Sequence, residues 1–407
     1  MTEVESPLSA TMSLASVLAP QADGYDGFPL HVLINGVSRF LQPTGICRHT
    51  VNLANCLVTR PQISRVTLVI GRWQQDYHRR YLDLDPRVNV LLMEGENSSR
   101  SRNLWFTFRL PRLAQQVAAD IVHLAFPVPL VARYEAAVVC SLHDLYPYDF
   151  PANNTALVRY YKKAVLRQCL ARTDGVGAIS QATLRSLLKH FPRLQCRNVH
   201  IVPNYPVLAA KDSRPAFAHG FQRFLLCVAQ HERNKQLDLT LAAFAELVPR
   251  DGATALSLVV VGSQASQTQL LLAQAEKLGI SSRVYWSPAL TDAELQWLYR
   301  HCDALLSTSA VEGFCLPLAE AMAVGAKMVC TDIPAHREVG GDWPEYVAAN
   351  ASPEQLASAI DRLLSGAHTK SPSLQYSADT TARAALALYA QAIRSRRCSA
   401  ICIRKRT

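Results

Sequence analysis

The segment ALLSTSAVEGFCLPLAEAMAVGAKMVCTDI, residues 304–333, contains the pattern that decides the fold. The runs 304–309 and 327–333 are short and mostly apolar, which is typical of buried strands. Between them, Pro317 is well placed for the first turn of a helix, and Gly313 permits a tight turn before it. The segment therefore predicts two buried strands joined by an apolar helix, with 309–314 as the loop that leaves the carboxyl end of the first strand.

The same alternation of short strands and longer amphipathic helices runs along the chain in two series. The first series of expected strands is 31–37, 66–70, 88–93, 120–125, 136–145, 175–180 and 198–204. The second is 224–229, 256–263, 284–289, 304–309 and 327–333. Apolar strands that alternate with helices predict parallel sheets covered on both faces. The expected fold class is α/β, with two doubly wound, Rossmann-like domains facing a central cleft where open α/β sheets bind ligands.

The places where the alternation starts and lapses suggest the domain boundaries. The expected division is a poorly ordered leader (1–28), an N-terminal domain (29–205), a linker rich in Pro, Ala and mixed charge (206–222), a C-terminal domain (223–375), a helix that could cross back to the N-terminal domain (376–394) and a basic tail (395–407).

Composition limits the class of protein. With 407 residues the chain suits two domains, and 49% of the residues are apolar, which fits large buried cores. No apolar run reaches the roughly 20 residues of a membrane-spanning helix, and the first residues are acidic and lack the basic start of a secretory signal. The chain has 11 cysteines, an odd number without CxxC or zinc spacing, which predicts buried reduced thiols in a cytosolic protein.

The positive charge is unevenly distributed. Of a formal net charge of +10, the tail RSRRCSAICIRKRT (394–407) carries six positive charges and no negative one. Such a tail could lie on an anionic membrane surface, and a solvated disordered end explains it equally well. The stretches 100–113 and 157–168 interleave Arg and Lys with aromatic residues, as in helices that dock on anionic lipid or in ordinary amphipathic packing helices. No groove-reading motif accompanies the charge, so nucleic-acid binding is not expected.

Two glutamates stand out in the segment that decides the fold. Glu312 lies in the loop after the strand, and Glu320 lies in the first part of the helix. The amino end of that helix can bind a phosphate, and carboxylates on either side of it can accept hydrogen bonds from the hydroxyls of sugars. This geometry suggests a nucleotide-sugar. The alternative is that Glu320 complements the helix dipole and Glu312 is a solvated loop charge.

The stretch resembles the EX7E signature of the retaining glycosyltransferases of family 4, which have the two-domain GT-B fold. The matching residues are Glu312-Gly313-Phe314, Leu316-Pro317, Glu320-Ala321-Met322-Ala323 and Gly325. The resemblance implies that Glu312 holds hydroxyls of the donor sugar and that Glu320 holds the ribose. It also implies that backbone amides around Gly313, Phe314, Cys315 and Leu316 contact the sugar and phosphate.

Three other segments resemble functional loops of the family. In CVAQHERNKQLDLTLAAF (227–244), Lys235 matches a diphosphate-binding lysine, whereas Gln230 stands where the family has arginine, so that Arg233 is the candidate substitute. Gly45, between the first strand and a helix, matches part of a glycine loop that lies against the donor phosphate. His143, at the end of the strand 136–145, matches a histidine near the reacting carbon of the sugar. Each of these also has a structural reading, as an ordinary loop charge, a simple turn or a strand-end histidine.

No metal or other cofactor is expected. Asp83-Leu84-Asp85 has the form of a DxD metal motif but stands alone in a polar loop before Pro86. Cationic side chains and a helix terminus can stabilise a departing diphosphate without metal. Ser180, in ISQAT (179–183), is predicted to be a helix N-cap.

The resemblance implies a retaining hexosyltransferase whose C-terminal domain (223–375) binds a nucleotide-sugar donor and whose N-terminal domain (29–205) binds a saccharide or lipid-linked saccharide acceptor. We expect Glu312, His143 and Lys235 at the reaction centre. The expected role is synthesis of bacterial surface polysaccharide or lipopolysaccharide, in the cytoplasm or peripherally at the inner face of the plasma membrane. A non-catalytic nucleotide-sugar-binding or assembly protein, or a GT-B sugar-nucleotide epimerase, are the alternatives.

Overall fold

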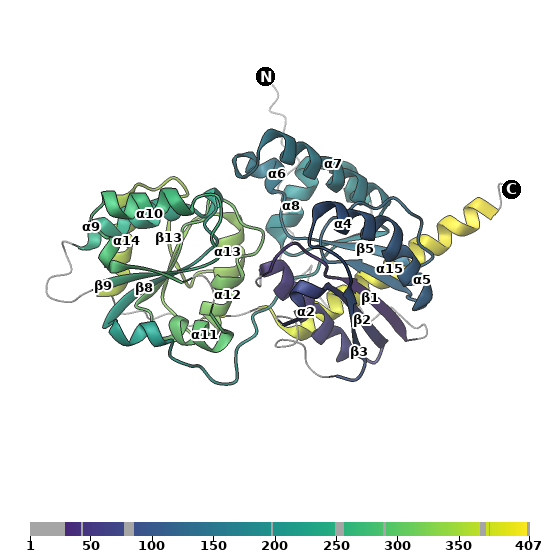
Figure 1. Cartoon of the computed structure of the whole chain (residues 1–407), viewed down its shortest axis with the longest axis horizontal. Coiled ribbons are helices and arrows are strands. Elements are labelled where there is room, and N and C mark those ends of the chain that lie inside the picture. Colours follow the sequence, from purple (N-terminus) through teal and green to yellow (C-terminus); the bar gives the residue numbers. More distant parts are fainter. Residues whose placement is uncertain are drawn as a thin grey trace, which may run out of the picture.

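The chain forms two α/β units, each built on its own parallel sheet (Figure 1). The computed structural model describes residues 29–41, 44–76, 85–196, 198–248, 256–287, 290–366, 372–373 and 375–404. The expected leader (1–28), Asp83 and Leu84 of the DxD sequence, and 405–407 of the tail lie outside these residues. Within the described ranges, no helix combines the length and hydropathy that crossing a bilayer requires.

The N-terminal sheet has seven strands in the order β3-β2-β1-β4-β5-β6-β7. The strands are β1 (Leu30–Asn35), β2 (Ile63–Gly71), β3 (Val88–Met93), β4 (Ile121–Leu124), β5 (Ala137–Leu142), β6 (Gly175–Ala178) and β7 (Val199–Ile201). The order reverses at β1, because β2 and β4 pair on either side of it in parallel. The main helices around this sheet are α2 (Gly45–Val58), α4 (Ser99–Leu104), α5 (Leu110–Gln116), α7 (Ala156–Arg172) and α8 (Gln181–His190).

The C-terminal sheet has six strands in the order β10-β9-β8-β11-β12-β13. The strands are β8 (Arg223–Val228), β9 (Leu256–Val261), β10 (Val284–Ser287), β11 (Ala304–Ser307), β12 (Met328–Thr331) and β13 (Glu345–Val347). The helices are α9 (Leu237–Leu247), α10 (Thr268–Lys277), α11 (Asp292–His301), α12 (Leu316–Ala323), α13 (Pro334–Gly340) and α14 (Pro353–Ser365). All described strand pairs of both sheets are parallel, so the α/β class with two doubly wound domains is confirmed.

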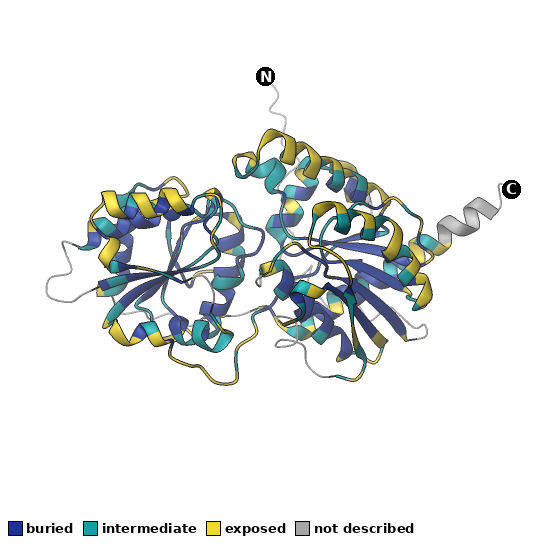
Figure 2. Cartoon of the chain, in the orientation of Figure 1, coloured by how far each residue is buried: buried dark blue, intermediate teal, exposed yellow. Residues whose placement is uncertain are grey.

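Local sequence explains where the helices begin. Ser180 accepts a hydrogen bond from the backbone N–H of Thr183 and caps α8, as the sequence predicted. Thr291 and Glu294 form a capping box at α11, and Ser352 does the same with Gln355 at α14. The central strands β1, β5 and β12 are buried along their whole length, and Figure 2 shows the two sheets as the buried layers of their domains.

The last helix, α15 (Ala378–Arg404), packs on the N-terminal unit although it follows the C-terminal one. It contacts α2, β5, β6 and β7, and in Figure 1 it is the yellow helix that crosses the N-terminal unit. The hydroxyl of Thr381 donates to the carbonyl of Pro203 at 3.0 Å. The helix continues beyond residue 394, where the sequence suggested a tail, because the following residues include neither glycine nor proline to stop it.

A chain of buried polar groups connects α15 to the interior of the N-terminal sheet. The hydroxyl of Tyr389 lies 2.7 Å from Nδ1 of His123, and Nε2 of His123 lies 2.8 Å from the hydroxyl of Ser141. The same hydroxyl lies 3.0 Å from Nε2 of His49 on α2. The ring of His49 then meets the ring of His143 edge to face, with centroids 4.9 Å apart.

Burial holds these imidazoles in the neutral form. It lowers the pKa of His123 to about 3, with a smaller contribution from His143, and it lowers the pKa of His143 to about 4. It also lowers the pKa of His49 well below the ordinary value. In the unfolded chain each imidazole returns to a pKa of about 6.5 and binds a proton that the folded state excludes.

We therefore expect the folded state to be most stable above about pH 6.5 and to lose stability as the pH falls toward the folded pKa values. Each histidine contributes up to about 1.4 kcal/mol per pH unit in this window. Urea denaturation at several pH values between about 7 and 4.5 measures the slope. His123→Gln is expected to reduce the slope, because one of the titrating groups is gone. A free energy of unfolding that does not change with pH in the wild type would contradict the neutral assignment.

Candidate active site

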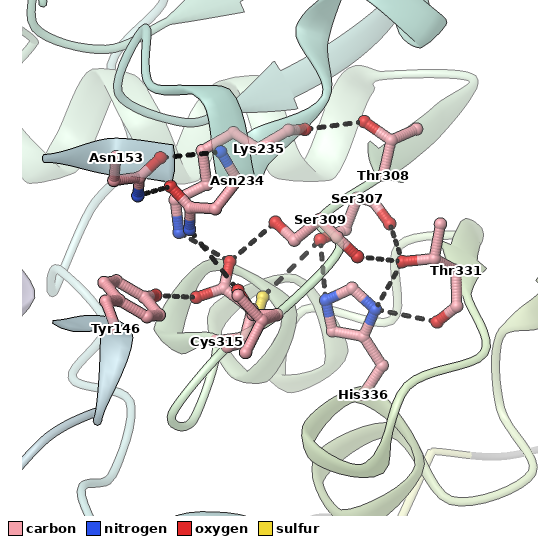
Figure 3. Close-up of polar contacts among 12 residues, drawn as sticks. Tyr146, Asn153, Asn234, Lys235, Ser307, Thr308, Ser309, Cys315, Thr331 and His336 are labelled. Carbon is pink, nitrogen blue, oxygen red and sulfur yellow. Dashed lines mark hydrogen bonds and ion pairs between the residues drawn. The ribbon is translucent and has the colours of Figure 1, made fainter. Parts of the chain in front are cut away.

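The candidate site lies where loops at the carboxyl ends of strands from both sheets meet. The loop after β11 carries Glu312, the turn after β8 carries Lys235, and the segment after β5 carries His143 and Tyr146. Parallel strands bring their carboxyl ends to one edge of a sheet, so residues far apart in the sequence converge. Figure 3 shows Lys235, Ser309 and Tyr146 around this centre.

Glu312 is nearly buried and has three side-chain partners. Its Oε1 accepts from Nζ of Lys235 at 2.6 Å and from the hydroxyl of Ser309 at 2.7 Å. Its Oε2 accepts from the hydroxyl of Tyr146, which belongs to the N-terminal domain, at 3.1 Å. The side chains of Glu312 and Lys235 are 8% and 18% exposed, so this ion pair is shielded from water. Glu312 is therefore not the solvated loop charge of the alternative reading.

The pair is charged in the folded protein. Burial alone would raise the pKa of Glu312, but the nearby Lys235 ammonium and the hydrogen bond from Ser309 outweigh it and hold that pKa below the ordinary value. Burial likewise opposes the charged form of Lys235, but the Glu312 carboxylate raises the pKa of this lysine. Both groups therefore keep their charge at neutral pH, and each compensates the other.

Gly313 is required by the contact between the domains. A Cβ atom at this position would lie 1.7 Å from the carbonyl oxygen of His143. The carbonyl of Gly313 in turn accepts hydrogen bonds from the hydroxyls of Ser180 and Thr183, the latter at 3.2 Å. The hydroxyl of Thr183 also lies 3.2 Å from the carbonyl of His143. The glycine thus lets the backbone of the C-terminal domain lie directly on that of the N-terminal domain.

His143 has a defined hydrogen-bonding state. Its Nε2 lies 2.9 Å from the carbonyl oxygen of Ala125, and a carbonyl can only accept, so Nε2 carries the proton. The pKa of His143, lowered to about 4 by burial, keeps the ring neutral near pH 7. Its Nδ1 is therefore a hydrogen-bond acceptor. The next residue, Asp144, has a raised pKa because burial outweighs the backbone N–H of Tyr146 and the charges of Lys162 and Lys235.

The start of α12 is shaped by Cys315, which adopts a left-handed conformation with φ 70° and precedes Leu316 and Pro317. Phe314 is buried, and its ring packs edge to face on Tyr376 at 4.9 Å. Donor atoms of Glu312, Cys315 and His336 lie within 4.8 Å of one another, a spacing that could hold a metal ion. Lys235 already neutralises the carboxylate of this group.

Glu320 occupies a different environment from Glu312. It is buried on α12, and its Oε2 accepts from the hydroxyl of Tyr299 at 2.9 Å. Burial raises the pKa of Glu320, although the charge of Arg48 and the hydrogen bond from Tyr299 oppose the shift. Arg48 comes from α2 of the N-terminal domain and forms an ion pair with Asp292 on α11. A small pocket at this place is lined by Arg48, Val207, Leu208, Asp292, Tyr299 and Glu320.

The remaining candidates are placed less centrally. Arg233 is exposed in the short helical turn that also carries Lys235. Gly45 is the first residue of α2, capped by Thr44, and the space beside its Cα is open. The structure thus brings Glu312, Lys235, Gly313 and His143 together and sets Glu320 in the neighbouring pocket.

Sequence reasoning missed several residues of this region. Tyr146 reaches Glu312, and Asn234 exchanges hydrogen bonds with Asn153 of the N-terminal domain, with Nδ2 of Asn153 donating at 2.8 Å. His336 donates from Nδ1 to the carbonyl of Thr331 at 2.9 Å (Figure 3). The contacts of Tyr146 and Asn234 join residues far apart in the chain, so no local signal marks them. Asn234, directly before Lys235, and Tyr146, three residues after His143, both lay close to recognised motifs.

Comparison with known proteins places both domains in described families. The model "Glycosyltransferase Family 4" matches residues 43–205, and the model "Glycosyl transferases group 1" matches residues 211–379. The chain is 30% identical over 178 residues to the serotype-specific mannosyltransferase WbdA of Escherichia coli, a match that covers 42% of this chain and 20% of WbdA. The match therefore spans about a fifth of the length of that relative.

A second relative covers more of its own length. The O-antigen chain mannosyltransferase B of Escherichia coli is 23% identical over 323 residues, covering 74% of this chain and 81% of the relative. Among solved structures, Anabaena HepE in complex with UDP-glucose superimposes with a TM-score of 0.62 at 17% identity, covering 90% of this chain and 95% of HepE. This structural likeness shows the GT-B fold. With one matching model on each domain, the chain belongs to the glycosyltransferases of family 4.

Proposed function

We propose that the protein is a retaining hexosyltransferase that moves a sugar from a nucleotide-sugar to a hydroxyl of a saccharide or lipid-linked saccharide during synthesis of a bacterial surface polysaccharide. The carrying observation is the shielded Lys235–Glu312 pair at the contact between the domains, next to the buried Glu320. Two relatives support a mannosyl donor and a polysaccharide product. One is named a serotype-specific mannosyltransferase, and the other is named an O-antigen chain mannosyltransferase.

In the proposed reaction the donor lies between the two domains. Lys235 holds the departing diphosphate and, with Arg233 nearby in the same turn, supplies the positive charge that the developing anion needs. Glu312 accepts hydrogen bonds from hydroxyls of the transferred sugar, and Glu320 accepts them from the ribose. The N–H groups at the start of α12, after Cys315, face the phosphate.

The protein positions the reactants and does not transfer the proton. The acceptor hydroxyl attacks the anomeric carbon from the face that the diphosphate leaves, so that the configuration is retained. Its proton goes to a leaving-group oxygen of the diphosphate. Nδ1 of His143, a neutral acceptor, receives a hydrogen bond from a sugar hydroxyl and orients the ring beside the reacting carbon. The close contact at Gly313 excludes water and limits hydrolysis of the donor.

The acceptor reaches this site from a membrane surface in our proposal. Leu104 and Phe108 are 51% and 57% exposed, and Leu157 and Tyr160 on α7 are 79% and 73% exposed. A hydrogen bond of 2.7 Å from Asn103 to the hydroxyl of Tyr161 ties these two segments together. The exposed apolar side chains alternate with Arg and Lys, which suits the headgroup region of an anionic inner membrane face.

Glu312→Gln and Lys235→Gln are each expected to reduce sugar transfer at least about 100-fold, because each removes a charge that positions or stabilises the reacting group. The assay measures release of nucleoside diphosphate in the presence of a chelator, because we propose a metal-independent reaction. Glu354→Gln, at an exposed position on α14, serves as the matched control and should retain full activity. Full activity in both site variants would refute the assignment.

A true donor should raise the unfolding temperature by mass action, about 2.7 kcal/mol of stabilisation at 100 times its Kd. We expect GDP-mannose to stabilise the protein more than UDP-glucose, ADP-glucose or dTDP-glucose in a thermal-shift screen. Glu320→Gln is expected to weaken the shift, because the ribose loses its carboxylate acceptor. If none of the four nucleotide-sugars stabilises the wild type, the proposed donor site is wrong.

Leu104→Ser combined with Phe108→Ser is expected to reduce binding to vesicles of phosphatidylglycerol and phosphatidylethanolamine, measured by co-sedimentation. Leu270→Ser, which changes a 64% exposed leucine on α10 of the other domain, is the control. Equal binding by the wild type and the double variant would show that this surface does not dock on lipid.

A further inference from the structure

Three cationic side chains gather on the N-terminal domain where α4, α7 and the loop after β1 approach one another. Arg39 and Lys162 are exposed, and Arg102 is half-buried. The side chain of Asn97 links α4 to the loop after β1, because it accepts from the guanidinium of Arg102 and donates to the carbonyl of Arg39 at 2.9 Å. The Asn103–Tyr161 hydrogen bond fixes α4 against α7.

Arg39 repels both Arg102 and Lys162, and nearby carboxylates offset this repulsion only in part. Burial and the charge of Arg39 lower the pKa of Arg102 and of Lys162, while the carboxylates of Asp144 and Glu232 oppose the shift at Lys162. In the part of the chain that the structure describes, none of the three forms an ion pair with a carboxylate; Lys162 instead donates to the amide oxygen of Asn154 at 2.6 Å. A cluster of like charges costs free energy in the unliganded protein unless an anion joins it.

The cluster borders the reaction centre. Asn153, beside the partner of Lys162, exchanges hydrogen bonds with Asn234, which precedes Lys235. Asp144, which follows His143, feels the positive charge of both Lys162 and Lys235. Lys235 of the C-terminal domain and Lys162 of the N-terminal domain therefore both act electrostatically on the carboxyl group of Asp144. The donor diphosphate needs Lys235, which leaves the other cluster for a different anion.

Phosphate is the ligand class that this set of donors fits. Two guanidinium groups can each offer a pair of parallel N–H donors to phosphate oxygens, and an ammonium adds a compact positive charge. A single carboxylate would leave two of the three charges uncompensated. A phosphate monoester, with a charge of about −1.5 to −2, or a diphosphate compensates more of the cluster.

We propose that Arg39, Arg102 and Lys162 form a binding site for a phosphate or diphosphate group of the acceptor. This inference rests on the proposed transferase function and adds the substrate class: a saccharide that carries a phosphate, either in solution or as the diphosphate link to a lipid. The anion anchors the acceptor on the N-terminal domain, and the hydroxyl to be glycosylated then reaches the centre beside His143.

Calorimetric titration with inorganic pyrophosphate tests the site directly. The wild type is expected to bind two equivalents, one at Lys235 and one at the cluster. The triple variant Arg39→Gln/Arg102→Gln/Lys162→Gln should bind one equivalent of pyrophosphate, at Lys235. The variant Lys235→Gln should also bind one equivalent, at the cluster. Arg133→Gln, an exposed arginine before β5 and so at the opposite end of that strand from the cleft, should bind two like the wild type. Two equivalents in the triple variant would overturn the proposal.

Transfer assays then distinguish the two sources of the phosphate. One arm offers mannose and mannose 1-phosphate in solution, and the other offers a saccharide diphosphate-undecaprenol in vesicles. For the acceptor that is used, the triple variant should show at least a tenfold higher KM than the wild type. An unchanged KM would overturn the proposal, as would equal use of mannose and mannose 1-phosphate combined with inactivity in the vesicle arm.

Unfolding separates a binding defect from a folding defect. The substitutions remove mutual repulsion but also the hydrogen bonds from Arg102 to Asn97 and from Lys162 to Asn154, so the triple variant should unfold within about 4 °C of the wild type. A larger drop in the unfolding temperature would show that the cluster is structural and would overturn the proposal. Failure of the proposed function gives a different result, since then no nucleotide-sugar stabilises the wild type and no transfer occurs with any acceptor.

Discussion

The contact of Gly313 with the carbonyl oxygen of His143 is the constraint on which the candidate site depends. Because a Cβ there would lie 1.7 Å from that oxygen, only glycine lets the two backbones touch. The contact places the loop after β11 next to Tyr146, whose hydroxyl donates to Oε2 of Glu312 at 3.1 Å. A wider gap between the domains would break this hydrogen bond and those that the carbonyl of Gly313 accepts from Ser180 and Thr183. The glycine therefore serves the junction of the domains as well as the turn.

The two glutamates of the segment 304–333 differ in their electrostatics, and the difference matches their proposed roles. Lys235 compensates Glu312, so this carboxylate stays ionised although it is buried. Burial raises the pKa of Glu320, which has a tyrosine hydroxyl as its hydrogen-bond donor. A group that is already ion-paired can exchange one neutral donor, such as the hydroxyl of Tyr146 or Ser309, for a sugar hydroxyl at little cost. Glu320 can exchange its own donor for a ribose hydroxyl in the same way.

The sequence predicted the strands and the central motif because both signals are local. Runs of apolar residues identified every strand except β13, which has three residues and lies at the sheet edge. The proline, glycine and glutamates of the segment 304–333 identified the loop and the start of α12. The Arg48–Asp292 ion pair and the reach of Tyr146 could not be predicted, since they depend on how two domains meet. The physical reason for Gly313 could not be predicted either. The turn that it permits is a local feature, whereas the carbonyl of His143 that leaves no room for a Cβ is distant in the sequence.

The buried polar chain adds a link from the last helix to the reaction centre. The single hydroxyl proton of Ser141 can go to only one of the two imidazoles that contact it, so the other imidazole must donate. The tautomers of His49 and His123 are therefore coupled, and the hydroxyl of Tyr389 of α15 can donate to or accept from Nδ1 of His123 to match either one. Nδ1 of His49 has no hydrogen-bond partner in the described structure, a cost of about 1–3 kcal/mol for a buried polar atom. An apolar residue would avoid that cost, so the edge-to-face contact of His49 with His143 argues that the imidazole serves to orient the neighbouring ring.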